Sequence, residues 1–185
     1  MNRMMLIINP RSGKGLAPGE RATAERIATE LGITLDVRTI DHPGHGKELA
    51  QEAVAAGMSR VISAGGDGTL NRIAAGLLHT KVAMGVVALG SGNGYARSLG
   101  LPLKPELALR RAFTGEPAQM DVCFINDIPF LGTAGIGFDA RVAHRFDKSK
   151  SRGMLGYARI IIKEIFGAPP MRVVVKANHE TTEAN

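Results

Sequence analysis

The sequence contains little cysteine and few aromatic side chains. Its 185 residues include one cysteine, Cys123, which excludes an internal disulfide framework, and we expect Cys123 to be a small core residue. The five histidines show no spacing typical of a metal site, and we expect His42 and His45, on either side of a Pro-Gly turn, to lie in solvent. There is no tryptophan and there are only two tyrosines, which disfavours nucleic acid as a partner, since proteins that stack bases interleave aromatic with basic residues.

Long apolar runs are also missing. The run from Met4 to Ile8 is too short for a membrane span or for the core of a signal peptide. We therefore expect no transmembrane segment and a cytoplasmic location, with peripheral attachment to the inner membrane face as an option. The net charge of +6 leaves two alternatives open, attraction to an anionic bilayer or an ordinary solvated surface. The densest basic stretch consists of Arg141, Arg145, Lys148, Lys150, Arg152, Arg159 and Lys163.

The apolar pattern alternates between two periods along the first two thirds of the chain. Short runs that are apolar throughout predict strands, and the stretches between them have the composition of helices. The predicted strands are 4–8, 34–40, 60–63 and 83–89, and the predicted helices are 17–31, 47–56, 70–78 and 106–113. Continuously apolar strands joined by helical crossovers indicate an α/β fold with a parallel sheet that is covered on both faces.

The segment from Ser63 to Asn71 is the most informative part of the sequence. It places three glycines, a carboxylate, a hydroxyl and an amide between a predicted strand and a predicted helix. Glycine lets a ligand approach bare backbone N–H groups, and the helix that follows offers its positive N-terminal end, so the segment predicts a phosphate site. Asp67 would repel a phosphate on its own, which suggests a bridging Mg²⁺ or a donor network and favours a nucleoside triphosphate.

Two further glycine-rich segments follow predicted strands. They are Asn9 to Gly15 and Gly90 to Arg97. Each resembles a known phosphate-binding loop without matching its spacing, so each alone fits an ordinary strand-to-helix turn equally well. In a parallel sheet, however, all three segments lie at the carboxyl ends of the strands, where ligands bind. Their common location therefore strengthens the prediction of a nucleotide site.

These three motifs together resemble a known family. Asn-Pro-x-Ser-Gly-x-Gly from Asn9, Gly-Gly-Asp-Gly-Thr-Leu-Asn from Gly65 and Gly-Ser-Gly-Asn-Gly-x-Ala-Arg from Gly90 are similar to the motifs of the diacylglycerol kinase catalytic-domain family. This family includes bacterial lipid kinases and the sphingosine and ceramide kinases, and NAD kinases are distant relatives. The resemblance implies a Rossmann-like ATP-binding domain over residues 1–118, followed by a β-rich second domain, with ATP, Mg²⁺ and a lipid hydroxyl meeting between them.

The resemblance also implies the site residues. Asp67 is the expected catalytic residue, through Mg²⁺ or by ordering the loop. The expected nucleotide contacts are Asn9, Ser12, Gly13, Gly65, Gly66, Asp67, Gly68, Thr69, Leu70, Asn71, Ser91, Gly92 and Asn93. Alternatives stay open for three side chains: Lys14 neutralises phosphate charge or lies on the surface, Arg97 does so or pairs with a carboxylate of the 106–113 helix, and Asn93 contacts ligand or caps the next helix.

Two positions depart from the family pattern. Arg72 stands where many members have a glutamate, and Ile40, beside Thr39, stands where many have a threonine. The placement of the nucleotide is therefore open at these two points, and Arg72 could contribute charge to the site or point to solvent.

The last third of the chain predicts the start of a second domain, over residues 119–185. A hairpin is expected from two runs, 120–125 and 128–131, with Asn126-Asp127 as its turn, then helices after 139 and over 153–166, and a strand over 171–177. A domain of typical size needs on the order of a hundred residues, so this domain looks truncated. The resemblance places the general base beyond Asn185, and we expect this chain to bind ATP weakly and to turn over lipid slowly or not at all.

Three function classes follow. The first is an ATP-dependent lipid kinase that phosphorylates a hydroxyl of diacylglycerol or a related lipid at a membrane surface. The second is a small-molecule kinase of the NAD-kinase type, and the third is a non-catalytic nucleotide-binding remnant. The oligomeric state is not predicted, and a homodimer is left open.

Overall fold

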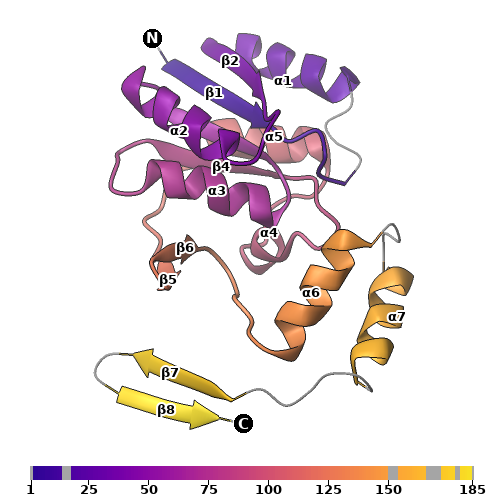
Figure 1. Cartoon of the computed structure of the whole chain (residues 1–185). Coiled ribbons are helices and arrows are strands. Elements are labelled where there is room, and N and C mark those ends of the chain that lie inside the picture. Colours follow the sequence, from indigo (N-terminus) through magenta and orange to yellow (C-terminus); the bar gives the residue numbers. More distant parts are fainter. Residues whose placement is uncertain (1, 14–17, 150–153, 166–171, 178–179, 185) are drawn as a thin grey trace. The chain divides into compact units, whose positions relative to one another are not determined.

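The chain folds into two compact units, Met1–Thr133 and Ala134–Asn185. The structure, a computed structural model, describes residues 2–13, 18–149, 154–165, 172–177 and 180–184 (Figure 1). The domain boundary that we expected at residue 118 stays a prediction. The boundary between the two compact units lies between Thr133 and Ala134, which is further along the chain.

The first unit is built on a parallel sheet of four strands with the order β2-β1-β3-β4. The strands are β1 (Asn2–Ile8), β2 (Ile33–Thr39), β3 (Arg60–Gly65) and β4 (Ala83–Ala88), and the helices are α1 (Pro18–Glu30), α2 (His45–Ala55), α3 (Asp67–Leu77), α4 (Gly94–Ser98) and α5 (Pro105–Thr114). Three of the helices connect successive strands. The predicted α/β class with a parallel sheet is therefore confirmed, and most predicted ends lie within a few residues of the observed ones.

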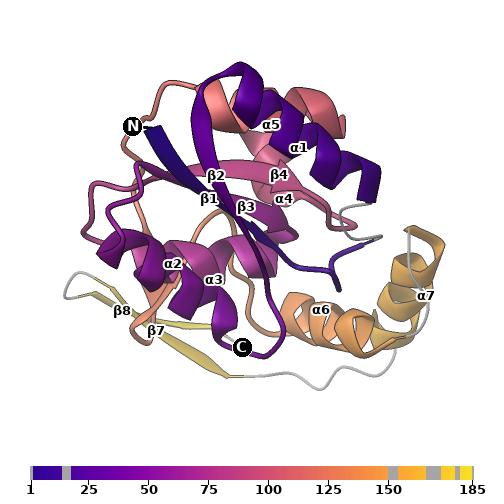
Figure 2. The ribbon, with the colours of Figure 1, turned by 90° about the horizontal axis from the view of Figure 1, so that it is seen from above.

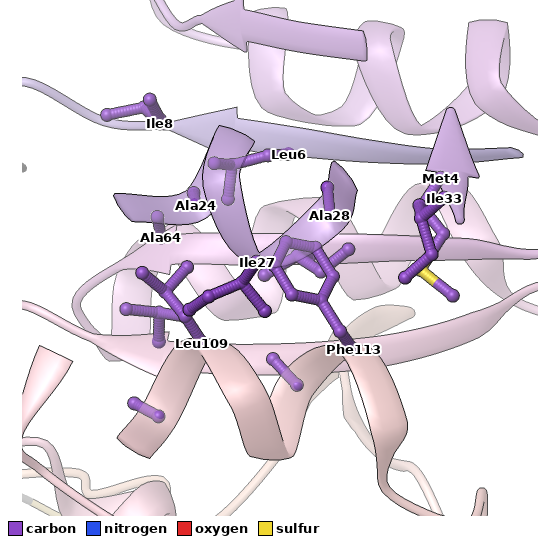
Figure 3. Packing of buried hydrophobic residues seen from close by; sticks show 14 residues of the cluster. Met4, Leu6, Ile8, Ala24, Ile27, Ala28, Ile33, Ala64, Leu109 and Phe113 are labelled. Atoms are coloured by element: carbon purple, nitrogen blue, oxygen red, sulfur yellow. The ribbon is translucent and has the colours of Figure 1, made fainter. Parts of the chain in front are cut away.

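Both faces of the sheet are covered by helices (Figure 2). Met4, Leu6 and Ile8 of β1 pack with residues of α1 and α5, among them Ile27 and Phe113 (Figure 3). The alternate residues Met5 and Ile7 pack on the other face with α2 and α3. Since successive side chains of a strand point to opposite faces, a strand buried on both faces must be apolar at every position, which is the pattern seen in the sequence.

The sheet has a switch point between β1 and β3. These two strands are neighbours, with Ile8 paired to Ala64, yet α1 follows β1 on one face and α3 follows β3 on the other. The chain therefore leaves the two strands in opposite directions. Such a divergence opens a crevice beyond the carboxyl ends of the strands, where ligands bind in open α/β sheets.

A short hairpin completes the first unit. Its strands are β5 (Cys123–Ile125) and β6 (Ile128–Phe130), and Asn126 and Asp127 both have positive φ, as a two-residue hairpin turn requires. The predicted hairpin is thus confirmed. The expectation that Cys123 is buried is wrong, because the two-stranded ribbon leaves Cys123, Phe124, Ile125 and Ile128 exposed.

The second unit contains two helices and a second hairpin. They are α6 (Phe138–Lys148), α7 (Met154–Ile165), and the antiparallel pair β7 (Val173–Ala177) and β8 (Glu180–Ala184), of which β8 was not predicted. Glu164 of α7 is buried and pairs with Arg141, at 3.0 Å, and Arg145, at 2.6 Å, both on α6. Two cations of the predicted basic stretch are therefore neutralised within the unit. Lys150 and Arg152 lie outside the described residues.

Candidate functional site

The three glycine-rich loops meet at the carboxyl ends of β1, β3 and β4. The Asn9 side-chain amide donates to Thr69 Oγ1 at 2.7 Å, and Ser12 Oγ lies 3.3 Å from the same hydroxyl. The N–H of Gly66 donates to Ser12 Oγ at 3.2 Å. These contacts join the loop after β1 to the start of α3 by side chains more than fifty positions apart in sequence, so the predicted convergence of the loops is present in the fold.

Asp67 joins the second loop to the third. Its Oδ2 accepts the N–H of Gly94 at 3.0 Å and its Oδ1 accepts the N–H of Tyr95 at 3.1 Å. Both N–H groups belong to the first turn of α4, where a helix has no acceptors of its own. Asp67 therefore acts as a cap supplied from another helix. The alternative in which the Asn93 side chain caps α4 is wrong, because no cap hydrogen bond is made by that side chain.

Some glycines of the loops are required for close packing of the backbone. A Cβ built on Gly13, whose φ is +58°, would lie 2.0 Å from the carbonyl oxygen of Leu89. A Cβ on Gly90 would lie 2.8 Å from the Cα of Gly66, and one on Gly65 would lie 2.6 Å from Thr69 Cβ. Because any side chain would force these segments apart, these glycines hold the loops against one another.

Other glycines of the same motifs face open space. Nothing lies within 4 Å of a Cβ built on Gly68, and the nearest atom to one on Gly92 is Asp67 Oδ2, at 3.9 Å. Both residues are exposed, as is Ser91. Gly68 is the second residue of α3, so its N–H has no partner within the helix and points toward the positive end of the helix dipole. This part of the motif leaves room for an anionic group.

Several predicted contact residues use their side chains inside the protein. Leu70 is buried in a cluster with Ala74 and Leu131, and Thr69 is 4% exposed and bonded to Asn9. Asn71 Oδ1 accepts the N–H of Leu131 at 2.9 Å, which ties α3 to the segment after β6. These side chains therefore stabilise the site through contacts within the protein.

Asn93 is the one residue of the third loop with an unsatisfied buried atom among those described. Its side chain is 8% exposed, and Oδ1 has no hydrogen-bond partner. Leaving such a group unpaired costs about 1–3 kcal/mol. Asn93 has left-handed backbone dihedrals, and its Oδ1 lies beside Gly90 where the second and third loops meet, so the amide is held at the junction of these two loops.

The cationic candidates are placed as follows. Arg97 donates from Nε to the carbonyl of Gly92 at 3.0 Å and so braces its own loop. Arg72 is exposed on α3, and Lys14 lies outside the described residues. Ile40 donates its N–H to the Ile8 carbonyl at 2.8 Å, which continues the pairing of β2 with β1.

Burial raises the pKa of the Tyr95 phenol above its usual value, so this side chain is neutral at physiological pH.

The residues present fit a nucleotide phosphate better than they fit a dedicated metal cage. Exposed glycines at Gly68 and Gly92, with the N-terminus of α3, provide the open backbone that suits phosphate oxygens. Asp67 is the single carboxylate in the three motifs, and each of its oxygens already accepts one N–H. Mg²⁺ takes one or two carboxylates together with phosphates and waters, so Asp67 could hold it only through its remaining lone pairs.

One cluster was missed by the sequence argument. Asp41, His42 and His45 bring their ligand atoms within 4.8 Å of one another, and His45 is largely shielded. The expectation that the histidines show no convergence is therefore wrong. Of the two histidines expected in solvent, His42 is exposed and His45 is not. The sequence feature that could have indicated this cluster is the Pro43-Gly44 turn, which reverses the chain between His42 and His45.

The chain matches one family profile and many relatives. The profile described as "Diacylglycerol kinase catalytic domain" matches residues 3–125. A "Probable lipid kinase YegS-like" of Chromohalobacter salexigens is 41% identical over 143 residues, which cover 75% of this chain and 45% of the relative. One of the same name from Klebsiella pneumoniae is 30% identical over 160 residues, covering 85% of this chain and 53% of the relative. The chain thus spans about half the length of these relatives.

Solved structures agree in fold. The crystal structure of a diacylglycerol kinase from Bacillus anthracis str. Sterne superposes with a TM-score of 0.73 at 23% identity, over 99% of this chain and 61% of that one. The profile covers well over half of the chain and includes all three glycine-rich loops. The chain therefore belongs to the diacylglycerol kinase catalytic-domain family.

Proposed function

We propose that this protein is an ATP-dependent lipid kinase that transfers the γ-phosphoryl group to a hydroxyl of diacylglycerol or a related lipid. One observation carries the proposal: hydrogen bonds join the three loops of the family motif at the switch point of the sheet, and Gly68 and Gly92 are exposed with open space around them. The names of the relatives and of the family point to the same chemistry.

The proposed roles follow from position. Phosphoryl transfer depends on placing the nucleophile in line with the γ-phosphate and on stabilising charge. Gly68, Ser91 and Gly92 contact phosphate oxygens, and the Asn93 amide meets the ligand at the loop junction. Asn9, Ser12 and Thr69 hold the loops in place, and Asp67 positions the third loop through α4. Bound Mg²⁺ would neutralise phosphate charge.

The second unit offers chemistry suited to a lipid surface. Arg159, Ile162 and Lys163 lie at helical i, i+3 and i+4 positions of α7 and are exposed, Ile162 by 58%. Basic side chains attract anionic head groups by about 1 kcal/mol each, and an apolar side chain among them can enter the interface. We propose that this face of α7 helps the protein to reach its lipid. Among the described residues, no helix is long and apolar enough to cross a bilayer.

A transfer assay tests the proposed function. Label from γ-labelled Mg-ATP is expected to enter diacylglycerol in anionic vesicles, at a low rate because the chain spans about half the length of its relatives. Less label is expected in neutral vesicles or at about 0.5 M salt, where ions screen charges beyond a few ångströms. Label in NAD instead of lipid would favour the small-molecule kinase. Binding of Mg-ATP with no labelled acceptor would favour a non-catalytic nucleotide-binding protein, and equal transfer in all vesicles would remove the role of α7.

Gly68→Ala is expected to separate nucleotide binding from folding. The new Cβ meets no protein atom, and alanine favours the helix by about 0.5–1 kcal/mol, so stability should be unchanged or slightly higher. The same Cβ would stand where phosphate approaches, and we expect Mg-ATP to bind about tenfold more weakly, which is about 1.4 kcal/mol. Thermal shift and calorimetry measure both effects. Gly19→Ala, equally open at the start of α1, is the matched control, and equal ATP affinity in both variants would contradict the site.

A further inference from the structure

The turn between β2 and α2 gathers four side chains that can bind a cation. His45 Nδ1 lies 2.6 Å from Asp41 Oδ1, and His42 Nε2 lies 3.4 Å from the same oxygen. His42 Nε2 also lies 3.6 Å from Glu48 Oε2, in the first turn of α2. Asp41, His42 and His45 come from five consecutive positions, so one turn of the chain supplies three of the four groups.

The backbone preorganises this cluster. Gly44 has φ +95°, a value that favours glycine, and it bends the chain so that the His42 and His45 rings stack with centroids 4.5 Å apart and planes 9° from parallel. The turn is closed by hydrogen bonds from the N–H of His45 to the His42 carbonyl and from the N–H of Lys47 to the Gly44 carbonyl. The side chains therefore converge without waiting for a ligand to order the chain.

The contact between Asp41 and His45 needs either a hydrogen atom or a metal ion. Asp41 Oδ1 and a lone pair of His45 Nδ1 would repel at 2.6 Å unless a proton or a metal ion lies between the two atoms. The N–H of Asp41 is 3.3 Å from the same Nδ1 and can donate to it only when that nitrogen carries no proton. Metal binding commonly replaces such a proton, since histidine coordinates in its neutral form.

The ligand chemistry indicates the class of metal. We propose that Asp41, His42 and His45, with Glu48 as the fourth ligand, form a site for a divalent transition-metal ion of the Zn²⁺ type. Zinc holds nitrogen and oxygen ligands at about 2.0–2.2 Å in a tetrahedron, which places the ligand atoms roughly 3.3–3.6 Å from one another. The distances of His42 Nε2 to the Asp41 and Glu48 carboxylates, 3.4 and 3.6 Å, already fall in this range. The 2.6 Å between His45 Nδ1 and Asp41 Oδ1 is shorter, so these two atoms must move apart by about 0.7 Å when a metal ion binds. Imidazole with carboxylate suits zinc, nickel and copper and does not suit Mg²⁺.

The proposed metal site is separate from the nucleotide loops. It lies where the chain leaves β2 and enters α2. A Cβ on Gly46, in the first turn of α2, would lie 3.1 Å from Ile40 and 3.6 Å from Ile73 of α3, so this end of α2 packs closely on its neighbours. A metal ion that bridges Asp41 to His45 and Glu48 would fix the first turn of α2 to the chain that leaves β2. Metal binding should therefore raise the melting temperature of the protein.

Calorimetry with ZnCl₂ on the whole chain tests the proposal. We expect saturable binding of one equivalent, a rise in melting temperature, and a tetrahedral Co²⁺ absorption spectrum after substitution. His42→Ala and His45→Ala should each weaken binding by at least about tenfold, because loss of a group that merely orients a ligand already costs about 10–100-fold. His42 is the more exposed of the two, so His42→Ala keeps the test valid should His45→Ala fail to fold.

Two controls make the result decisive. His144→Ala removes a histidine of α6 and should leave zinc binding unchanged. MgCl₂ should produce no heat from this site and no difference between wild type and His42→Ala. Absence of saturable zinc binding, or equal affinity in wild type and His42→Ala, would overturn the site. Neither result would bear on the proposed kinase function, because no residue of the cluster belongs to the nucleotide loops.

Discussion

Gly90→Ala is expected to lower the free energy of unfolding by about 1–3 kcal/mol and to weaken Mg-ATP binding at least tenfold. The added Cβ would stand 2.8 Å from the Cα of Gly66 and 2.9 Å from Asn93 Oδ1. The first of these atoms belongs to the backbone, so the loops after β3 and β4 must separate, and overpacking of this kind carries a cost of that size. Separation would also displace Gly92 from Gly68, and both are open positions of the proposed nucleotide site.

Gly92→Ala is the matched control for this variant. It lies two residues further on, where the nearest atom to a new Cβ is 3.9 Å away, so denaturant unfolding should show wild-type stability. Equal stabilities for the two alanine variants would mean that the loops do not require the close approach of Gly90 to Gly66. That result would contradict the inference that Gly90 is needed for close backbone contact while Gly92 is not.

Asp67→Ala is expected to have a similarly large effect on nucleotide binding. It removes the acceptor of two N–H groups at the start of α4, and loss of a helix cap costs about 0.5–2 kcal/mol. The third loop would no longer be attached to the start of α3, so Mg-ATP should bind at least about tenfold more weakly, which is about 1.4 kcal/mol or more. In wild type, saturation at a hundred times Kd should add about 2.7 kcal/mol to stability.

Asp67→Asn distinguishes two roles for this residue. The amide keeps one acceptor oxygen, so a cap would retain part of its stability and most of its ATP affinity. A carboxylate that binds Mg²⁺ would lose both charge and ligand, and Asp67→Asn would then bind Mg-ATP as poorly as Asp67→Ala. Asp36→Ala is the control and should leave ATP binding unchanged. Asp36 lies on β2, an edge strand of the sheet, and its carboxylate pairs with Arg38.

Much of the fold could be predicted because the local pattern of apolar residues in each strand and helix reflects which of its faces are buried. A strand such as β1, buried on both faces, is apolar at each of its last five positions, and no other environment explains that run as well. Helix ends were predicted less closely. The helix expected from Leu70 begins at Asp67, because Gly66 serves as its N-cap and the motif itself supplies the first turn.

The environment of the last third was harder to predict. Cys123 lies in a run with the composition of a buried strand, yet it is exposed, because burial depends on an opposing layer that a two-stranded hairpin lacks. Arg141 and Arg145 look like surface cations, and both pair with the buried carboxylate of Glu164. The burial of Cys123 and the pairing of the two arginines both depend on segments distant in sequence. Glu164 is present for the arginines, and an opposing layer is missing for Cys123.

The sequence by itself determined the α/β class, the order of most strands and helices, and the edge of the sheet where three glycine-rich loops gather. It did so because periodicity and turn residues are local properties. Tertiary structure alone decided which glycines pack and which stay open, that Asp67 caps α4 in place of Asn93, and that Asp41, His42 and His45 converge. These outcomes depend on distances between atoms of separate segments or on the path of one turn, which residue types and spacing do not specify.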